Sequence, residues 1–204
     1  IAVFVALLLA YGVRLNPHPV ARGAARIAGL GYAVPGSVIA VGVLVPLAWV
    51  DNTLDSWLRA SFGVSSGLLL SGTITALMFA YVVRFLAVSL NTVDASLAKV
   101  TPAMDGVART LGMGPAATVA RVHVPIISPS LLTAGLLVFV DVMKELPATL
   151  ILRPFDFNTL AVRAFELASD EQLRAAAAPA LAIVAAGLIP VALLSLAISR
   201  ARPG

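Results

Sequence analysis

Long apolar runs, separated by short polar segments, dominate the chain. Four of these runs contain no Lys, Arg, Asp or Glu, namely residues 27–50, 60–83, 122–140 and 175–199. A helix needs roughly 20 apolar residues to cross the hydrocarbon core of a bilayer. Each run is therefore a candidate membrane span, and a fifth, shorter run occupies residues 1–13. The pattern predicts an all-α, polytopic membrane protein.

Interpreting these runs as helices gives the expected order of spans and loops along the chain. We expect spans near 27–50, 64–89, 126–144 and 178–199, with an outside loop at 51–62. The first run is too short to span and lacks the features of a signal peptide, so we expect it to be the second half of a span that begins upstream. In the outside segment 145–177, Phe165 and Leu167–Leu173 alternate with charges and predict an amphipathic surface helix.

Composition supports the membrane class. Of 204 residues, 60% are hydrophobic and 12% are charged, whereas soluble domains have about 45–50% apolar and about 25% charged residues. A soluble fold of this length would lack the charges for its surface. The chain has no cysteine, which excludes disulfides and thiolate metal sites.

The distribution of Lys and Arg assigns the connections to the two sides of the membrane, because cytoplasmic loops carry an excess of these residues. Segments 14–26, 84–121 and 200–204, which include Arg84 and Arg202, carry nine basic and two acidic residues, a net of +7. The other connections carry five basic and eight acidic residues, a net of −3, and the two sum to +4. We expect the first set to be cytoplasmic. Topology thus explains the basic charge, with no nucleic-acid partner.

The predicted cytoplasmic segment 90–125 interrupts the apolar pattern with glycines, prolines and charges. Thr101 and Pro102 are typical of a helix start, because a hydroxyl side chain caps well and proline suits the first helical position. Asp105 falls in the first turn, where the helix dipole favours a negative charge, and Gly112 is placed to end the helix. Helical spacing predicts one apolar face, formed by Val100, Met104, Val107 and Leu111.

A second short helix is predicted directly after the first. Gly114 and Pro115 form its start, and Pro125 closes it before the next span. Two short helices joined by a glycine turn are too polar to enter lipid. This local pattern fits either an interfacial connection that only joins two spans or a loop with a function of its own.

The spacing of the segment resembles the cytoplasmic motif of permease subunits of binding-protein-dependent ABC importers, E-A-A-x3-G-x9-I-x-L-P. The matching positions are Ala108, Gly112, Val122, Val124 and Pro125. The match is complete in spacing from the glycine to the proline, with aliphatic residues replacing aliphatic ones. The resemblance implies that residues 105–125 form a coupling loop that docks into a cytoplasmic ABC ATPase and transmits its closure to the spans.

The start of the motif departs from the family. Its glutamate aligns with Gly106 and its first alanine with Val107, and the neighbouring Asp105 is the candidate for the missing acidic group. Carried over by position, Ala108, Gly112 and Pro125 hold the shape of the loop. A small residue suits a close approach between helices, and a glycine suits a forced turn. Arg109 is a candidate polar contact with the ATPase.

Three longer stretches resemble the second half of iron(III)-type permeases. They are LGYAVPGSVIAVGVLVPLAW, VVRFLAVSL and LVFVDVMKELPATLILRPFDFNTLAVRAFELASDEQL. The resemblance implies a type I importer fold (MetI-like) over residues 1–204, with five of six spans present, in the bacterial inner membrane. It also implies three partners, which are an ATPase dimer that binds ATP and Mg²⁺, a periplasmic substrate-binding protein and another permease half. The chain itself is expected to bind no cofactor.

Charged residues cluster at the end of the third predicted span. Asp141, Lys144 and Glu145 are spaced i, i+3 and i+4, so we expect all three to share one helix face. Two interpretations remain open. Lys144 neutralises both acids at the interface, or the three residues form a gate or cation path, where carboxylate oxygens suit a hard ion such as ferric iron.

The sequence does not favour an enzyme. The phosphate-loop pattern G-x4-G-K-[ST] is absent, as is HExxH. Energy from ATP therefore requires another subunit. The alternatives to ferric iron are sulfate, thiamine and polyamine, which related importers carry. Two other classes of protein stay open: an ion-gradient-driven secondary transporter with Asp141 and Glu145 as coupling acids, and a membrane scaffold without transport.

Overall fold

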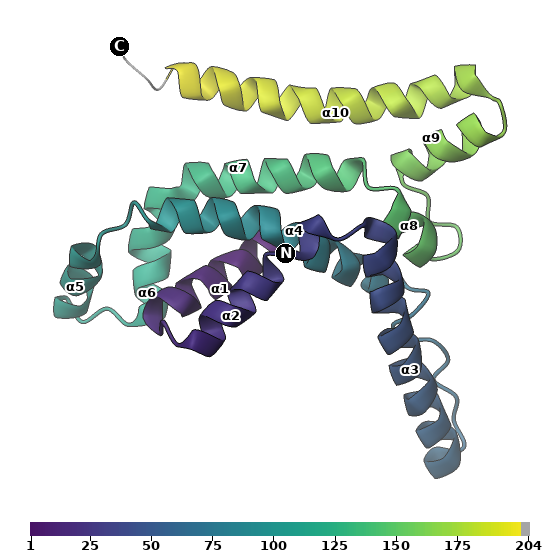
Figure 1. The fold of residues 1–204 in the computed structure, drawn as a ribbon, viewed down its shortest axis with the longest axis horizontal. Helices are drawn as coiled ribbons and strands as arrows, with labels where there is room; N and C mark the ends of the chain where they lie inside the picture. The colour runs from purple at the N-terminus through teal and green to yellow at the C-terminus, as the bar shows by residue number, and fades with distance from the viewer. Residues whose placement is uncertain (201–204) are drawn as a thin grey trace. The chain divides into compact units, whose positions relative to one another are not determined.

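The fold, taken from a computed structural model whose described residues are 1–200, consists of helices joined by short loops (Figure 1). The α-helices in this range are α1 (Ala2–Leu15), α2 (Pro19–Ala28), α3 (Gly36–Phe62), α4 (Ile74–Leu97), α5 (Pro102–Thr110), α6 (Pro115–Thr118), α7 (Val124–Met143), α8 (Pro147–Leu152), α9 (Leu160–Ser169) and α10 (Leu173–Arg200). Residues 1–200 contain no strand, so the all-α prediction is confirmed. Arg202, counted on the cytoplasmic side, lies outside the described residues.

Within residues 1–200, four helical stretches are long and apolar enough to cross a membrane. They are Gly36–Phe62, Ile74–Leu97, Pro115–Met143 and Leu173–Ala192. Each overlaps one of the four predicted spans, which confirms a multi-pass membrane protein. Helix α1 is apolar but shorter, at 14 residues. Large apolar side chains remain exposed on these helices, as on α10 at Leu181, Val184 and Leu188, which is expected of surfaces that face lipid.

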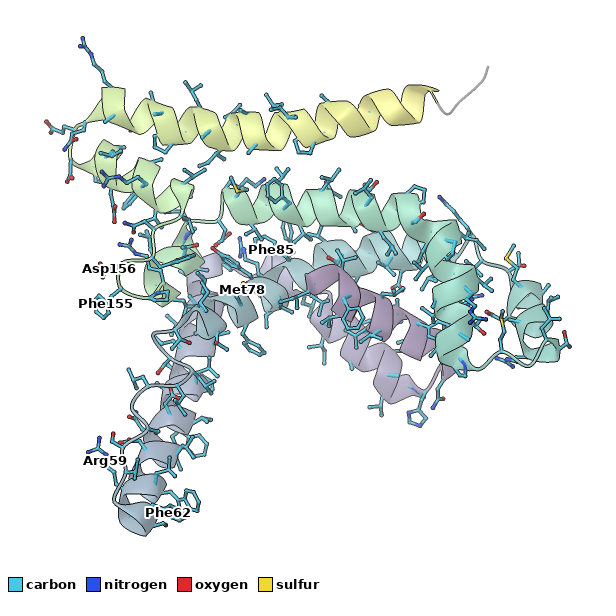
Figure 2. The ribbon with its side chains drawn as sticks, turned by 180° about the vertical axis from the view of Figure 1, so that it is seen from behind. Arg59, Phe62, Met78, Phe85, Phe155 and Asp156 are labelled. Atoms are coloured by element: carbon cyan, nitrogen blue, oxygen red, sulfur yellow. The ribbon has the colours of Figure 1, made fainter. Side chains whose placement is uncertain are left out.

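The boundaries of α3 differ from the sequence prediction. The helix begins at Gly36 instead of residue 27, and the predicted outside loop at 51–62 is wrong, because α3 continues to Phe62. At 1.5 Å per residue its 27 residues extend about 40 Å, beyond the hydrocarbon core of about 30 Å. Arg59 and Phe62 lie in the last turn (Figure 2), and Gly63 ends the helix with a left-handed φ of 67°.

Two aspartates explain why α3 tolerates charges in its second half. Asp51 is buried and accepts hydrogen bonds from the backbone N–H groups of Leu69 and Leu70 and from Ser71, which donates both its N–H and its hydroxyl group. Asp55, one turn later, pairs with Arg59 at 2.6 Å and accepts further bonds from residues 65–67. The loop that follows α3 therefore folds back along the helix and satisfies both carboxylates.

The chain divides into two compact units, which are described separately. Unit 1 comprises Ile1–Leu30 and Leu86–Val138, and unit 2 comprises Gly31–Phe85 and Phe139–Gly204. Both α4 and α7 contribute to each unit.

The core of unit 1 forms where α1, α4 and α7 pack together. Its buried side chains are Ala6 and Ala10 of α1, Leu86, Leu90, Val93 and Leu97 of α4, Val100, and Ile127 of α7. The alanines of α1 allow close approach to the larger side chains of α4. Helix α2 lies beside α1, and α5 lies beyond the C-terminal end of α4 (Figure 1).

The core of unit 2 joins α3, α4 and α8. Its buried side chains are Ile39, Ala40 and Val43 of α3, Ala76, Leu77 and Ala80 of α4, and Ala148 and Leu152 of α8. Helix α9 then packs against α10 as a helical hairpin (Figure 1). The predicted amphipathic helix is found at α9, but it ends at Ser169 instead of continuing to Leu173. Glu171 adopts a left-handed φ of 61° at the turn into α10.

Candidate functional site

The predicted first helix of the coupling loop is α5, which begins at Pro102 as expected. Thr101 occupies the N-cap position, although its side chain makes no capping hydrogen bond. Gly112 has a φ of 76° and donates to the carbonyl of Arg109, and Met113 donates to the carbonyl of Ala108. This pair of bonds is a Schellman ending, which requires a left-handed residue that glycine provides without strain. The predicted role of Gly112 as the end of α5 is confirmed.

An apolar groove of about 330 Å³ lies along α5. Its lining residues are Ala103, Met104, Val107, Ala108, Leu111, Met113 and Val122. Val107 and Leu111 are 59% and 72% exposed, whereas Ala108 is buried at 2%. The prediction that Val100 shares this face is wrong, because Val100 precedes the helix and is buried in the core of unit 1.

The second helix begins as predicted but does not end at Pro125. Gly114 is its N-cap and Pro115 its first residue. Helix α6 then continues through a π-helical segment, Val119–His123, directly into α7. The N–H of Val124 bonds to the carbonyl of Val119, five residues back. This wider turn lets the chain pass Pro125, which has no N–H to donate, so the helix is not interrupted.

Asp105 holds α5 to the rest of unit 1. Its Oδ2 atom lies 2.8 Å from an Nη atom of Arg14, and its Oδ1 atom lies 2.6 Å from Nε2 of His123. Arg14 also donates to the carbonyls of Leu97 and Val100 at 2.9 and 2.7 Å. One guanidinium therefore joins the end of α1, the end of α4 and the first turn of α5.

The environment of Asp105 favours its charged form. Desolvation acts to raise its pKa, but hydrogen bonds from Arg14 and His123, together with their charges, outweigh desolvation and keep the pKa below the ordinary value of 3.8. Both carboxylate oxygens are engaged within the chain. The use of Asp105 as the acidic residue of the motif stays a prediction.

His123 is the residue that sequence reasoning undervalued. Its place beside Arg121 predicts an interfacial position, but its side chain is completely buried. Tyr11 contacts it edge-on, with ring centroids 5.2 Å apart, and the Tyr11 hydroxyl donates to the carbonyl of Pro115 at 3.3 Å. Among the described residues, Nδ1 of His123 has no hydrogen-bond partner. No local pattern predicted this burial, because the partners of His123 come from α1 and α5.

Two further motif positions are open to solvent. A Cβ atom added to Gly106 would meet nothing within 4 Å, so the missing glutamate is not excluded by crowding. Arg109 is exposed on α5 and lines a small cavity with Tyr11 and Asp105. Val122 lies in the apolar groove. These positions leave the predicted docking surface accessible.

The three charged residues at the end of α7 do not share one helix face, because α7 ends at Met143, before Lys144 and Glu145. Asp141 and Lys144 pair at 2.8 Å, and this hydrogen bond and the charge of Asp141 raise the pKa of Lys144. Glu145 turns away and is 6% exposed. The interpretation that Lys144 neutralises both acids is therefore wrong for Glu145.

Glu145 pairs with Arg84 instead. Arg84 Nε lies 3.0 Å from Glu145 Oε2, an ion-pair distance, although its N–H is not aligned for a hydrogen bond. Arg84 also donates to the carbonyl of Val34 at 2.6 Å, and Glu145 Oε1 accepts from the N–H of Ala148 at 3.2 Å. A Cβ atom added to Gly36 would collide with Glu145 Oε1. Glycine at position 36 therefore makes room for the carboxylate.

This pair corrects the charge-based topology. Arg84 was assigned to the cytoplasmic side and Glu145 to the outside, yet the two side chains are in contact. Because α4 continues to Leu97, Arg84 lies near the middle of the helix and not at its cytoplasmic end. A neighbouring hydroxyl pair extends the cluster, since the oxygens of Tyr81 and Thr149 lie 2.5 Å apart.

The relatives of the chain are transport permeases. It is 32% identical over 169 residues to the Fe(3+)-transport system permease protein FbpB 2 of Haemophilus influenzae, an alignment that covers 83% of this chain and 30% of that protein. The chain is related to the permease subunits of ABC importers. The predicted resemblance is thereby confirmed. The relatives are transport permeases, which supports the prediction of a non-enzymatic transport subunit.

Two Salmonella relatives belong to the same class. The PhnV permease proteins of Salmonella typhimurium and Salmonella choleraesuis, assigned to a 2-aminoethylphosphonate transport system, are each 26% identical over 160 residues. These alignments cover 78% of this chain and 54% of each relative. No protein-family model matches the chain. The chain thus spans about a third to a half of the length of these relatives.

Proposed function

We propose that this chain is the membrane-spanning part of an ATP-driven importer that moves ferric iron into the cytoplasm by alternating access across the bacterial inner membrane. In this proposal residues 105–125 couple the spans to an ATPase dimer, which binds ATP and Mg²⁺. A periplasmic binding protein delivers the substrate, and another permease half completes the pathway. The likeness to FbpB 2 supports the iron assignment.

The observation that carries the proposal is the exposed apolar groove of α5. Val107 and Leu111 present large apolar side chains on a short polar helix, an arrangement that suits insertion into a groove of a partner. The contacts of Asp105 with Arg14 and His123 join α5 to α1, to the end of α4 and to the helical segment that continues as α7. A displacement of α5 is therefore transmitted to these helices.

The experiment is a comparison of Leu111→Asp with Lys99→Gln in the full permease co-produced with its ATPase. Lys99 is an exposed charge outside the groove. We expect Leu111→Asp to abolish ATPase co-purification and uptake, because a buried charge in an apolar contact has no partner, whereas Lys99→Gln retains both. Normal association and uptake of Leu111→Asp would contradict the coupling role and favour the secondary-transporter alternative.

The substrate requires a separate test. Uptake of radiolabelled ferric iron, 2-aminoethylphosphonate, sulfate, thiamine and polyamine is compared before and after deletion of the gene. We expect deletion to remove only iron uptake. Loss of another substrate would overturn the iron assignment and leave the permease assignment intact.

A further inference from the structure

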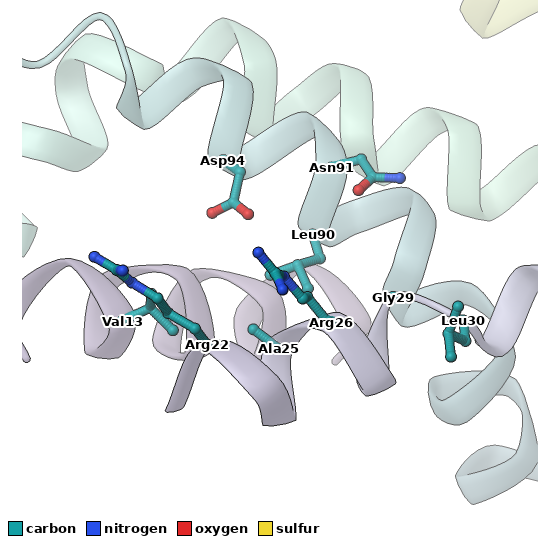
Figure 3. A pocket seen from close by; sticks show the side chains of 9 residues that line it. All are labelled: Val13, Arg22, Ala25, Arg26, Gly29, Leu30, Leu90, Asn91 and Asp94. Carbon is teal, nitrogen blue, oxygen red and sulfur yellow. The ribbon is translucent and has the colours of Figure 1, made fainter. Parts of the chain in front are cut away.

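A cavity of about 570 Å³ lies between α2 and α4 in unit 1 (Figure 3). Its polar lining consists of Arg22 and Arg26 from α2 and Asn91 and Asp94 from α4. Figure 3 shows Asp94 pointing toward α2, with Arg26 rising toward α4 and Arg22 one turn away. The volume falls within the range of about 300–1,000 Å³ that is typical of small-ligand sites.

The charges of this cavity have no partners of their own. Among the side chains that the structure describes, Arg22, Arg26 and Asp94 make no ion pair and no side-chain hydrogen bond. Two guanidiniums and one carboxylate are therefore available to a ligand. A ligand with a negative and a positive group matches this arrangement, because the carboxylate would repel a ligand that is only anionic.

The surroundings of the cavity place it at a membrane surface. Val20 and Ile27, seven residues apart on α2, are each 72% exposed, and they project from the helix side opposite Arg22 and Arg26. An apolar face opposite a basic face is typical of a helix that lies in the membrane interface. Asp94 belongs to the last turn of α4, which ends at Leu97, so the carboxylate lies near the end of a span.

The geometry points to a binding site for the headgroup of phosphatidylethanolamine between α2 and α4. The phosphate accepts hydrogen bonds from Arg22 and Arg26, a pairing that guanidinium groups favour. The ammonium donates to the carboxylate of Asp94 and the amide oxygen of Asn91. The acyl chains contact Leu30, which lines the cavity and is 60% exposed, a contact that a soluble phosphate ester without acyl chains would not make.

The test is native mass spectrometry of the full permease complex, delipidated in detergent and titrated with short-chain phosphatidylethanolamine, phosphatidylcholine or phosphatidylglycerol. Phosphatidylcholine has the same phosphate but no N–H donors, so we expect phosphatidylethanolamine to bind about tenfold more tightly, as one charge-assisted hydrogen bond allows. Asp94→Asn should remove this preference, and Asp94→Glu should keep it. Arg22→Gln with Arg26→Gln should weaken all three lipids, and Lys99→Gln should weaken none.

Three results would overturn the proposal. The first is equal binding of phosphatidylethanolamine and phosphatidylcholine to the unmodified protein, and the second is tighter binding of phosphatidylglycerol, which would indicate a general anionic-lipid site. The third is binding of phosphoethanolamine without acyl chains as tightly as the lipid. If Asp94→Asn fails to fold, Asp94→Glu still tests the proposal. It preserves the carboxylate and should therefore keep the preference for phosphatidylethanolamine over phosphatidylcholine.

Discussion

At the scale of single residues, Arg84 and Glu145 place two opposite charges within a predominantly apolar fold. Charged groups at membrane depth are costly and usually face a partner or a cavity. The isolation of Arg84 was itself a signal, since it is the only charge between Arg59 and Asp94. Its partner could not be predicted from sequence, because the contact depends on where α7 ends.

We expect Glu145→Ala to destabilise the protein by about 3–5 kcal/mol, because it leaves Arg84 buried without its counter-charge. The double variant Arg84→Met with Glu145→Leu should recover most of this loss, since it removes both charges and keeps apolar volume. Thermal unfolding in detergent measures the stability of the single and the double variant. Equal destabilisation of the single and double variants would show that the unpaired charge of Arg84 is not what destabilises Glu145→Ala.

Asp105 predicts a pH dependence of the coupling loop. Its folded-state pKa lies below the ordinary 3.8, so the carboxylate stabilises the folded loop at neutral pH. That contribution is lost as the pH falls below 3.8 and through the lower folded pKa. Arg14 and His123 face the carboxylate, and Arg109 lies nearby.

Hydrogen exchange of the α5 amides, corrected for intrinsic rates, measures this effect. We expect protection to fall between about pH 5 and about pH 2, and Asp105→Asn to show weak protection already at neutral pH. Protection that is independent of pH, or equal in the two proteins, would contradict the anchoring role.

At the scale of helices, one glycine inside α5 and one at its C-terminal end provide a matched pair of positions. Gly112→Ala should cost about 1 kcal/mol, because alanine is strained at a φ of 76°. Gly106→Ala should stabilise by about 0.5–1 kcal/mol, since position 106 lies inside α5 with open space around it. Thermal unfolding of both variants decides this. A greater loss at Gly106 than at Gly112 would mean that the Schellman ending is unimportant.

Helix existence was more predictable than helix boundaries. Apolar runs without charges correctly indicated four spans, because an apolar stretch of that length has few other stable environments. The ends of α3 and α4 were misplaced, because Asp51, Asp55 and Arg84 are satisfied by partners distant in sequence. Local signals such as Pro102 and Gly112 placed α5 correctly, since capping needs only neighbouring residues.

At the scale of the whole molecule, the relatives and the motif agree on a transport permease, while the site was only partly predictable. The spacing identified Ala108, Gly112 and Val122, which lie in or beside the apolar groove. It did not identify Arg14 or His123, which hold that groove in place. A spacing motif identifies residues of one local segment, whereas the residues that anchor this segment come from other helices.

The central claim is that α5 transmits ATPase movement to the spans through its apolar groove. Because the chain has no cysteine, Leu111→Cys introduces its only thiol, and Lys99→Cys provides a control outside the groove. The decisive measurement is thiol cross-linking of each variant, in the full permease complex, to the co-produced ATPase. We predict that Leu111→Cys forms one ATPase adduct whose yield changes when ATP is added, and that Lys99→Cys forms none. No adduct at position 111, or equal adducts at both positions, would contradict the account.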